Sequence, residues 1–223
     1  MAIKPILFNT EMVRAILDGR KTCTRRIAKG FIPDDALWGY TAFTPKGYIS
    51  CRGVYADGYG EGFYKLPYQP GDILYVRETW QYLYELDGNE QVIEDTGKYY
   101  YAATDTIPFD TYVDENGVTH DHAPWRPSIH MPKEAARIWL KVTNVRAERL
   151  QDITDDGAKA EGANWKNGKN VGWEEKMRRT AVERFAEIWD STIKKSDRDR
   201  CGWYANPWVW VIEFERCEKP QEV

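Results

Sequence analysis

Apolar and polar residues follow patterns along the chain that predict an order of helices and strands. Residues 12–17 place apolar side chains at helical spacing, and either Asn9 or Thr10 can cap the N-terminus of this helix. Gly19 suits the left-handed backbone conformation that ends many helices. The pattern therefore predicts a first helix that ends just before a cluster of basic residues.

Further along, the pattern changes from strand-like to helical and back. Buried strands are predicted at 73–77 and 208–214, and a half-buried strand from 137 through 145, where apolar and polar residues alternate. A short helix is predicted between Thr154, which can cap it, and Gly162. The longest helix is expected over 173–193, where apolar residues form one stripe typical of a core-facing helix.

Two stretches have little helical periodicity and are rich in turn residues. The first, at about 27–69, contains a strand signal at 47–53 and an Asp57-Gly58 turn, so it predicts a β-hairpin. The second, at about 81–128, carries a strand signal at 99–102 between several turn signals. We interpret both as insertions within a single domain that covers residues 1–223.

Composition and charge narrow the class of protein. The 223 residues are 42% hydrophobic and carry a net charge of −4, so a nucleic-acid surface, if present, must be a local patch. The four cysteines form no CxxC motif, which favours free thiols in a reducing compartment. No apolar run is long enough to span a membrane and no signal-peptide pattern is present, so we expect a cytoplasmic protein. Aromatic residues make up 14%, which fits either cleft-lining side chains or barrel packing.

The densest chemistry lies in residues 19–26, where four cations and two threonines occur within eight residues. One interpretation is a solvated basic turn, because cations are favoured at a helix C-terminus. The other is a reactive pair, because a helix-to-strand corner can bring the Lys21 amine beside the Thr24 hydroxyl as base and nucleophile. Since Lys21 just follows a helix end, we expect it at the surface, where truncation leaves no cavity.

The same stretch resembles a known family. Residues 16–26 (ILDGRKTCTRR) are similar to the N-terminal motif of the ASCH domain family, in the PUA-like superfamily. Similar motifs follow in the family's order at Pro70–Leu74, Leu150–Gly162 and Trp208–Phe214. The resemblance implies an α+β fold, a PUA-like β-barrel of five to six strands with flanking helices.

The resemblance also implies an activity. Small members of the family are amidohydrolases that remove the acetyl group from N(4)-acetylcytidine with a Lys-Thr-Glu constellation, whose positions match Lys21, Thr24 and Glu161 here. Thr24 would attack the acyl carbonyl or orient a water, and Lys21 would need a lowered pKa to act as base. Glu161 would hold Lys21 or protonate the leaving nitrogen, and the sequence leaves the acid and base assignment open. A Glu before a helix-ending glycine is also typical of a solvated position.

Four further residues are candidates for substrate binding. Arg26 matches the basic end of the family motif and would bind a phosphate or carbonyl, with a surface ion pair as the alternative. Arg77, Arg126 and His130 are chosen for their strand-end or Pro-flanked positions, and His130 fits a packed or surface histidine equally well. The Asp-rich turn around His120 and His122 favours a solvated loop over a metal site. We expect no metal and no other cofactor.

Two other functions remain open at this stage. A non-enzymatic RNA-binding module would use the same basic residues and aromatics to bind phosphates and stack bases. A ribonuclease is supported only by a looser family resemblance. In every case the expected partner is a nucleoside or RNA ligand rather than a membrane, and the insertions leave the substrate undefined.

Overall fold

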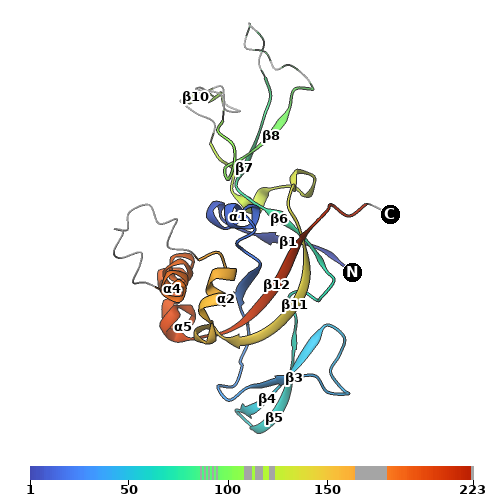
Figure 1. The fold of residues 1–223 in the computed structure, drawn as a ribbon, viewed down its shortest axis with the longest axis vertical. Coiled ribbons are helices and arrows are strands. Elements are labelled where there is room, and N and C mark those ends of the chain that lie inside the picture. Colours follow the sequence, from blue (N-terminus) through green and yellow to red (C-terminus); the bar gives the residue numbers. More distant parts are fainter. Residues whose placement is uncertain are drawn as a thin grey trace. The chain divides into compact units, whose positions relative to one another are not determined.

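The computed structural model describes residues 1–85, 87, 89, 91, 93, 95–107, 112–113, 118–120, 124–163 and 180–221. These residues form helices and several β-sheets, which confirms the α+β class (Figure 1). The chain divides into two compact units. The first unit comprises 1–2, 19–72 and 141–215, and the second comprises 3–18, 73–140 and 216–223. The assignment of the whole chain to one domain stays a prediction.

The largest sheet has five strands in the order β1-β6-β11-β12-β2. Its outermost strands are β1 (Ile3–Leu7) and β2 (Cys23–Ile27). β1 runs parallel to β6 (Ile73–Arg77), and β2 runs antiparallel to β12 (Trp208–Cys217). No pairing between the two outermost strands closes this sheet among the described residues, so the PUA-like barrel stays a prediction.

Among the described residues, the first unit contains α2 (Asp155–Ala160), α4 (Ala181–Thr192) and α5 (Arg198–Cys201). Its further strands are β3 (Leu37–Gly39), β4 (Tyr48–Tyr55), β5 (Gly58–Lys65) and most of β11 (Trp139–Arg149). It also has the 3-10 turns η3 (Leu150–Asp152), η5 (Lys195–Asp197) and η6 (Trp203–Ala205).

Two capped helices of this unit pack over its part of the sheet. Thr154 caps α2 by accepting a hydrogen bond from Gly157 N, and Thr180 forms a capping box with Glu183 at the start of α4. The apolar stripe of α4 packs into one core with residues of α2 and β12 (Ala158, Phe185, Trp189, Val209, Val211). The first helix and the helix between Thr154 and Gly162 are confirmed. The longest helix begins at Ala181 and not at 173, because Thr180 has an extended backbone and caps it, and residues 173–179 lie outside the described range.

The first predicted insertion carries a three-stranded antiparallel sheet in the order β3-β4-β5. The hairpin turns through Ala56 and Asp57, and Gly58, the first residue of β5, has a φ of +116°, a conformation that favours glycine. Trp38 of β3 packs edge-on against Trp208 and Trp210 of β12 and against Tyr64 of β5. This aromatic cluster joins the insertion to the rest of the first unit.

The second unit is built around its own apolar core. Its remaining elements are α1 (Thr10–Leu17), β7 (Trp80–Leu83), β8 (Lys98–Tyr101), β9 (Tyr112–Val113), β10 (Thr119–His120), η1 (Ser128–His130) and η2 (Lys133–Ala135). Asn9 caps α1 and Gly19 follows it with a φ of +72°, as predicted.

The buried Glu78 carboxylate accepts two 2.9 Å hydrogen bonds from the Arg137 guanidinium. This bidentate pair satisfies a charge that burial would otherwise disfavour.

Candidate active site

Lys21 is positioned by a short extended segment of the first unit. Thr22 N donates to Ala160 O at 2.8 Å, and Phe214 N donates to Thr22 O at 2.9 Å, so residues 21–22 lie between the end of α2 and strand β12. Lys21 itself forms a β-bridge with Glu161, the C-cap of α2. The backbone therefore brings together two residues that are 140 positions apart in sequence.

The Lys21 ammonium is surrounded by acceptors. Its Nζ donates to Glu161 Oε2 at 2.5 Å, to Glu161 O at 2.9 Å and to Cys23 O at 2.8 Å. The side chain is only 1% exposed. Three acceptors match the three N–H groups of an ammonium, so the resting site holds a buried Lys21–Glu161 ion pair.

The burial of Lys21 changes the pKa of its amine. Burial lowers the pKa of Lys21, opposed by the carboxylate of Glu161, and the positive charge of Arg26 lowers it further. This is the direction that a lysine base requires.

The expectation of a surface lysine is wrong, because the extended segment carries Lys21 under the end of α2 and leaves the residue 3% exposed. Truncation of Lys21 would therefore leave a buried carboxylate with one partner fewer.

Glu161 has a second cationic partner that the sequence patterns did not assign. Arg25 of β2 donates from Nη1 to Glu161 Oε1 at 3.3 Å and from Nη2 to Glu148 Oε1 at 2.5 Å. Burial lowers the pKa of Arg25, but the carboxylates of Glu161 and Glu148 outweigh it and raise the pKa. The site is thus a four-residue network of alternating charge. Glu148 gave no sequence signal because it lies in an ordinary polar position near the end of β11.

Thr24 lies beside this network rather than within it. It is buried on β2, and its hydroxyl accepts a 2.8 Å hydrogen bond from Arg26 Nη1. Desolvation lowers the pKa of Arg26 below its usual value and outweighs the charges of Glu161 and Tyr68, which raise it. Arg26 is therefore within electrostatic reach of Glu161 and links Thr24 to the ion pair. Tyr68, a half-buried aromatic before the Gly71 turn, is a neighbour that the sequence patterns missed.

The other three predicted binding residues belong to the second unit. Arg77 donates to Ile129 O at 3.1 Å and lies over the Tyr75 ring, and Arg126 lies over the Trp80 ring. His130 is exposed at the end of η1. The contacts of the two arginines explain their positions within that unit, and substrate binding by all three residues stays a prediction. The side chains of His120 and His122 lie outside the described part of the chain.

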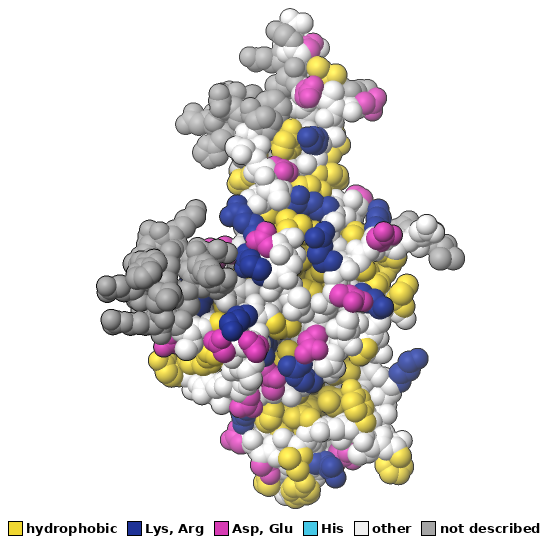
Figure 2. Space-filling view, viewed as in Figure 1, with side chains coloured by type: hydrophobic (Ala, Val, Ile, Leu, Met, Phe, Trp, Pro, Cys, Tyr) yellow, Lys and Arg dark blue, Asp and Glu magenta, His cyan; other side chains and the backbone are white. Residues whose placement is uncertain are grey.

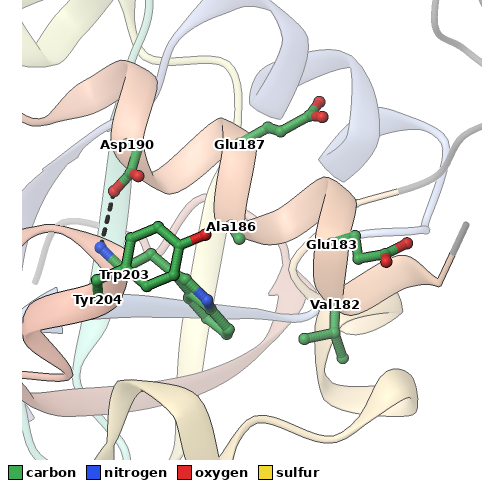
Figure 3. A pocket seen from close by; sticks show the side chains of 7 residues that line it. All are labelled: Val182, Glu183, Ala186, Glu187, Asp190, Trp203 and Tyr204. Atoms are coloured by element: carbon green, nitrogen blue, oxygen red, sulfur yellow. Dashed lines mark hydrogen bonds between the residues drawn. The ribbon is translucent and has the colours of Figure 1, made fainter.

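A separate hollow of about 410 Å³ lies on the first unit between α4 and η6 (Figure 3). Three of its lining side chains are carboxylates, and each has a structural partner. Glu183 accepts from Thr180 N in the capping box, Glu187 pairs with Arg184, and Asp190 accepts from Trp203 N. Glu183 and Asp190 hold the local backbone, Glu187 pairs with a side chain, and the hollow contains none of the predicted catalytic residues.

Cys23 lies two residues after Lys21, and its environment predicts a thiol of low reactivity. Burial and the charge of Glu161 raise the pKa of Cys23 to about 12, so the reactive thiolate is scarce at neutral pH. All four cysteines are free, and Cys51 is buried while Cys201 and Cys217 are partly exposed. A thiol-reactive reagent should modify two cysteines in the folded protein and four after denaturation. Rapid native-state labelling of Cys23, located by peptide mass spectrometry, would contradict this arrangement.

Comparison of the chain with protein-family models, with curated proteins and with solved structures gave no match. The described residues contain no group of three His, Cys, Asp or Glu side chains placed to hold a metal ion. No helix in the described ranges is both long and apolar enough to cross a membrane. The assignment of a function therefore depends on the chemistry of the Lys21–Glu161 site.

Proposed function

We propose that this protein is an amidohydrolase that removes the acyl group from an N-acylated cytidine such as N(4)-acetylcytidine, on a PUA-like barrel. The observation that carries the proposal is the buried Lys21–Glu161 pair, with Nζ 2.5 Å from Oε2. Burying two charges is unfavourable unless they are paired, and such pairs recur at functional sites. Thr24, within the same basic stretch and bonded to Arg26, supplies the third group that the chemistry needs.

The short distance between Lys21 and Glu161 suggests the first proton transfer. Lys21 can pass a proton to Glu161 over 2.5 Å, and burial, which lowers the pKa of Lys21, favours the neutral amine. The amine then accepts the proton of the Thr24 hydroxyl, directly or through a water, as Oγ attacks the acyl carbonyl. Protonated Glu161 gives its proton to the leaving cytosine nitrogen as the C–N bond breaks. Water hydrolyses the resulting threonyl ester, releasing the carboxylic acid.

Arg26 has two roles in this proposal. Its guanidinium donates to Thr24 Oγ1, so its positive charge stabilises the hydroxyl oxygen as that oxygen becomes more negative. The same side chain is exposed, so its outer face can approach a substrate carbonyl or phosphate. A substrate with a phosphate would therefore bind more tightly than the free nucleoside.

A second candidate is a non-enzymatic RNA-binding module. It is favoured by the electrostatic interaction of Arg26 with Tyr68, because a guanidinium and an aromatic side chain can together hold a phosphate and stack a base. Under this alternative, Lys21 and Glu161 serve only to hold the end of α2. The two functions differ in the role of Thr24, which touches substrate only in the enzyme.

Substitution of Thr24 separates these functions. Thr24→Ser keeps a hydroxyl next to Arg26 and is expected to retain measurable release of cytidine, whereas Thr24→Ala is expected to lose about a hundredfold or more in rate. Release is followed by chromatography, with circular dichroism to verify that both variants are folded. Equal rates for the two variants would contradict a role for the hydroxyl. An RNA-binding module predicts that neither substitution changes RNA affinity appreciably.

A further inference from the structure

Strand β5 forms an open edge of the first unit. It is the last strand in the order β3-β4-β5, and no described strand pairs with its outer side. It is eight residues long, and an edge strand of this length leaves a row of backbone N–H and C=O groups available for pairing. In Figure 1, β4 and β5 form the tip of the hairpin at the lower end of the view, and Figure 2 shows hydrophobic atoms gathered there.

The direction of the backbone groups follows from the β4–β5 register. Leu66 N donates to Gly47 O at 2.9 Å, so the residue after the strand faces β4. Antiparallel strands alternate between residues that bond the neighbour and residues that bond outward. The even-numbered residues of β5 therefore face β4, and the N–H and C=O groups of its odd-numbered residues face the open edge (Tyr59, Glu61, Phe63, Lys65).

The side chains of these odd-numbered residues are exposed. Tyr59 is 66% and Phe63 40% exposed, and across the strands Val54 of β4 and Leu37 of β3 are exposed on the same face. Monomeric proteins rarely expose so many large apolar side chains together unless the surface binds a partner. Within the part of the chain that the structure describes, neither Glu61 nor Lys65 forms an ion pair.

We infer that β5 pairs antiparallel with β5 of a second copy of this chain and joins two three-stranded sheets into one of six strands. A two-fold axis through Phe63 would place Phe63 opposite its counterpart. The same register sets Glu61 opposite Lys65 of the second copy, and Lys65 opposite Glu61. All paired residues have backbone groups that face the open edge, so the register supplies hydrogen bonds, an aromatic contact and two ion pairs together.

Charge complementarity favours this occupant and this register. An axis through Glu61 would oppose two carboxylates, and an axis through Gly62 would set Glu61 against Phe63. The register centred on Phe63 pairs both charges. An unrelated extended peptide would gain the backbone hydrogen bonds alone, without a defined charge pattern.

A charge-swap experiment tests the inference. Wild type is expected to show a concentration-dependent monomer–dimer equilibrium in sedimentation velocity. Glu61→Lys sets lysine against lysine at two positions, and Lys65→Glu sets glutamate against glutamate, so each variant alone should dimerise at least tenfold more weakly. An equimolar mixture of the two variants restores both ion pairs and should recover dimers of wild-type affinity, as should the double variant.

The controls make each result decisive. Lys195→Glu makes the same charge change on exposed η5, away from β5, and should dimerise like wild type. Circular dichroism verifies that every variant is folded. A wild type that stays monomeric at all concentrations would overturn the inference. Single variants that dimerise like wild type, or a mixture that fails to recover dimers, would overturn it equally.

Discussion

Glu161→Gln is expected to lower the free energy of unfolding by about 3 kcal/mol, because it removes the carboxylate that two buried cations share. The change keeps the shape of the side chain and removes its charge. Lys21 retains two carbonyl acceptors and Arg25 retains Glu148, so the cost lies at the lower end of the range for breaking a buried ion pair. The same variant should lose acyl hydrolysis, because the amide cannot take up the proton of Lys21.

Glu148→Gln is the matched control. Glu148 also contacts Arg25, but its side chain is 17% exposed and it has a second, more exposed partner in Arg146. Its substitution is expected to cost about 1 kcal/mol, in the range of partly exposed pairs. Urea denaturation followed by circular dichroism measures both variants. If they were equally destabilised, the buried pair with Lys21 would not be the main source of stability at this site.

Lys21→Met is expected to reduce the rate of acyl hydrolysis about a hundredfold or more while the protein remains folded. Methionine has a similar length and no charge, and Glu161 keeps Arg25 as a partner, so the buried carboxylate is not left alone. Lys141→Met is a suitable control, since Lys141 forms an exposed ion pair with Glu215 in the same unit. A Lys21→Met variant with the wild-type rate would show that Lys21 is not the base.

The pH dependence gives a second readout of the same substitution. Catalysis needs the single proton that Lys21 and Glu161 share, and burial lowers the pKa of Lys21 from 10.5, so the rate of wild type should fall as pH rises past a midpoint below 10.5, where the pair loses that proton. The unfolded chain binds this proton more tightly than the folded chain, so the free energy of unfolding should rise with pH in the same interval. Both pH effects should be missing in Lys21→Met.

The local elements could be predicted from sequence because their signals are local. The cap at Asn9, the left-handed Gly19, the Asp57-Gly58 hairpin and the strand at 73–77 depend on nearest neighbours in sequence, and the structure has each of them. The pairing of Lys21 with Glu161 came from the family resemblance and not from periodicity. The structure joins the two by a β-bridge. The role of the pair in catalysis stays a prediction.

The features of the site that the sequence did not predict depend on contacts between segments that are far apart in the sequence. Lys21 was expected at the surface, but its burial depends on residues 160–161 and 214, which no local pattern connects to it. Glu148 lies among charged residues at the end of β11, where no pattern distinguishes it, and its contact with Arg25 forms only when β11 and β2 are in place. Tyr68 is one of fourteen tyrosines, so its proximity to Arg26 had no distinguishing signal.

The central claim is that the Lys21–Thr24–Glu161 site hydrolyses an N-acylated cytidine. Incubation of the purified wild-type protein with N(4)-acetylcytidine, followed by chromatography, tests it most directly. Release of cytidine and acetate in equal amounts is expected, with no release by folded Lys21→Met. It would be contradicted if wild type released no cytidine from free or RNA-borne acetylcytidine, while Lys21→Ala and Arg26→Ala weakened salt-sensitive RNA binding by similar factors.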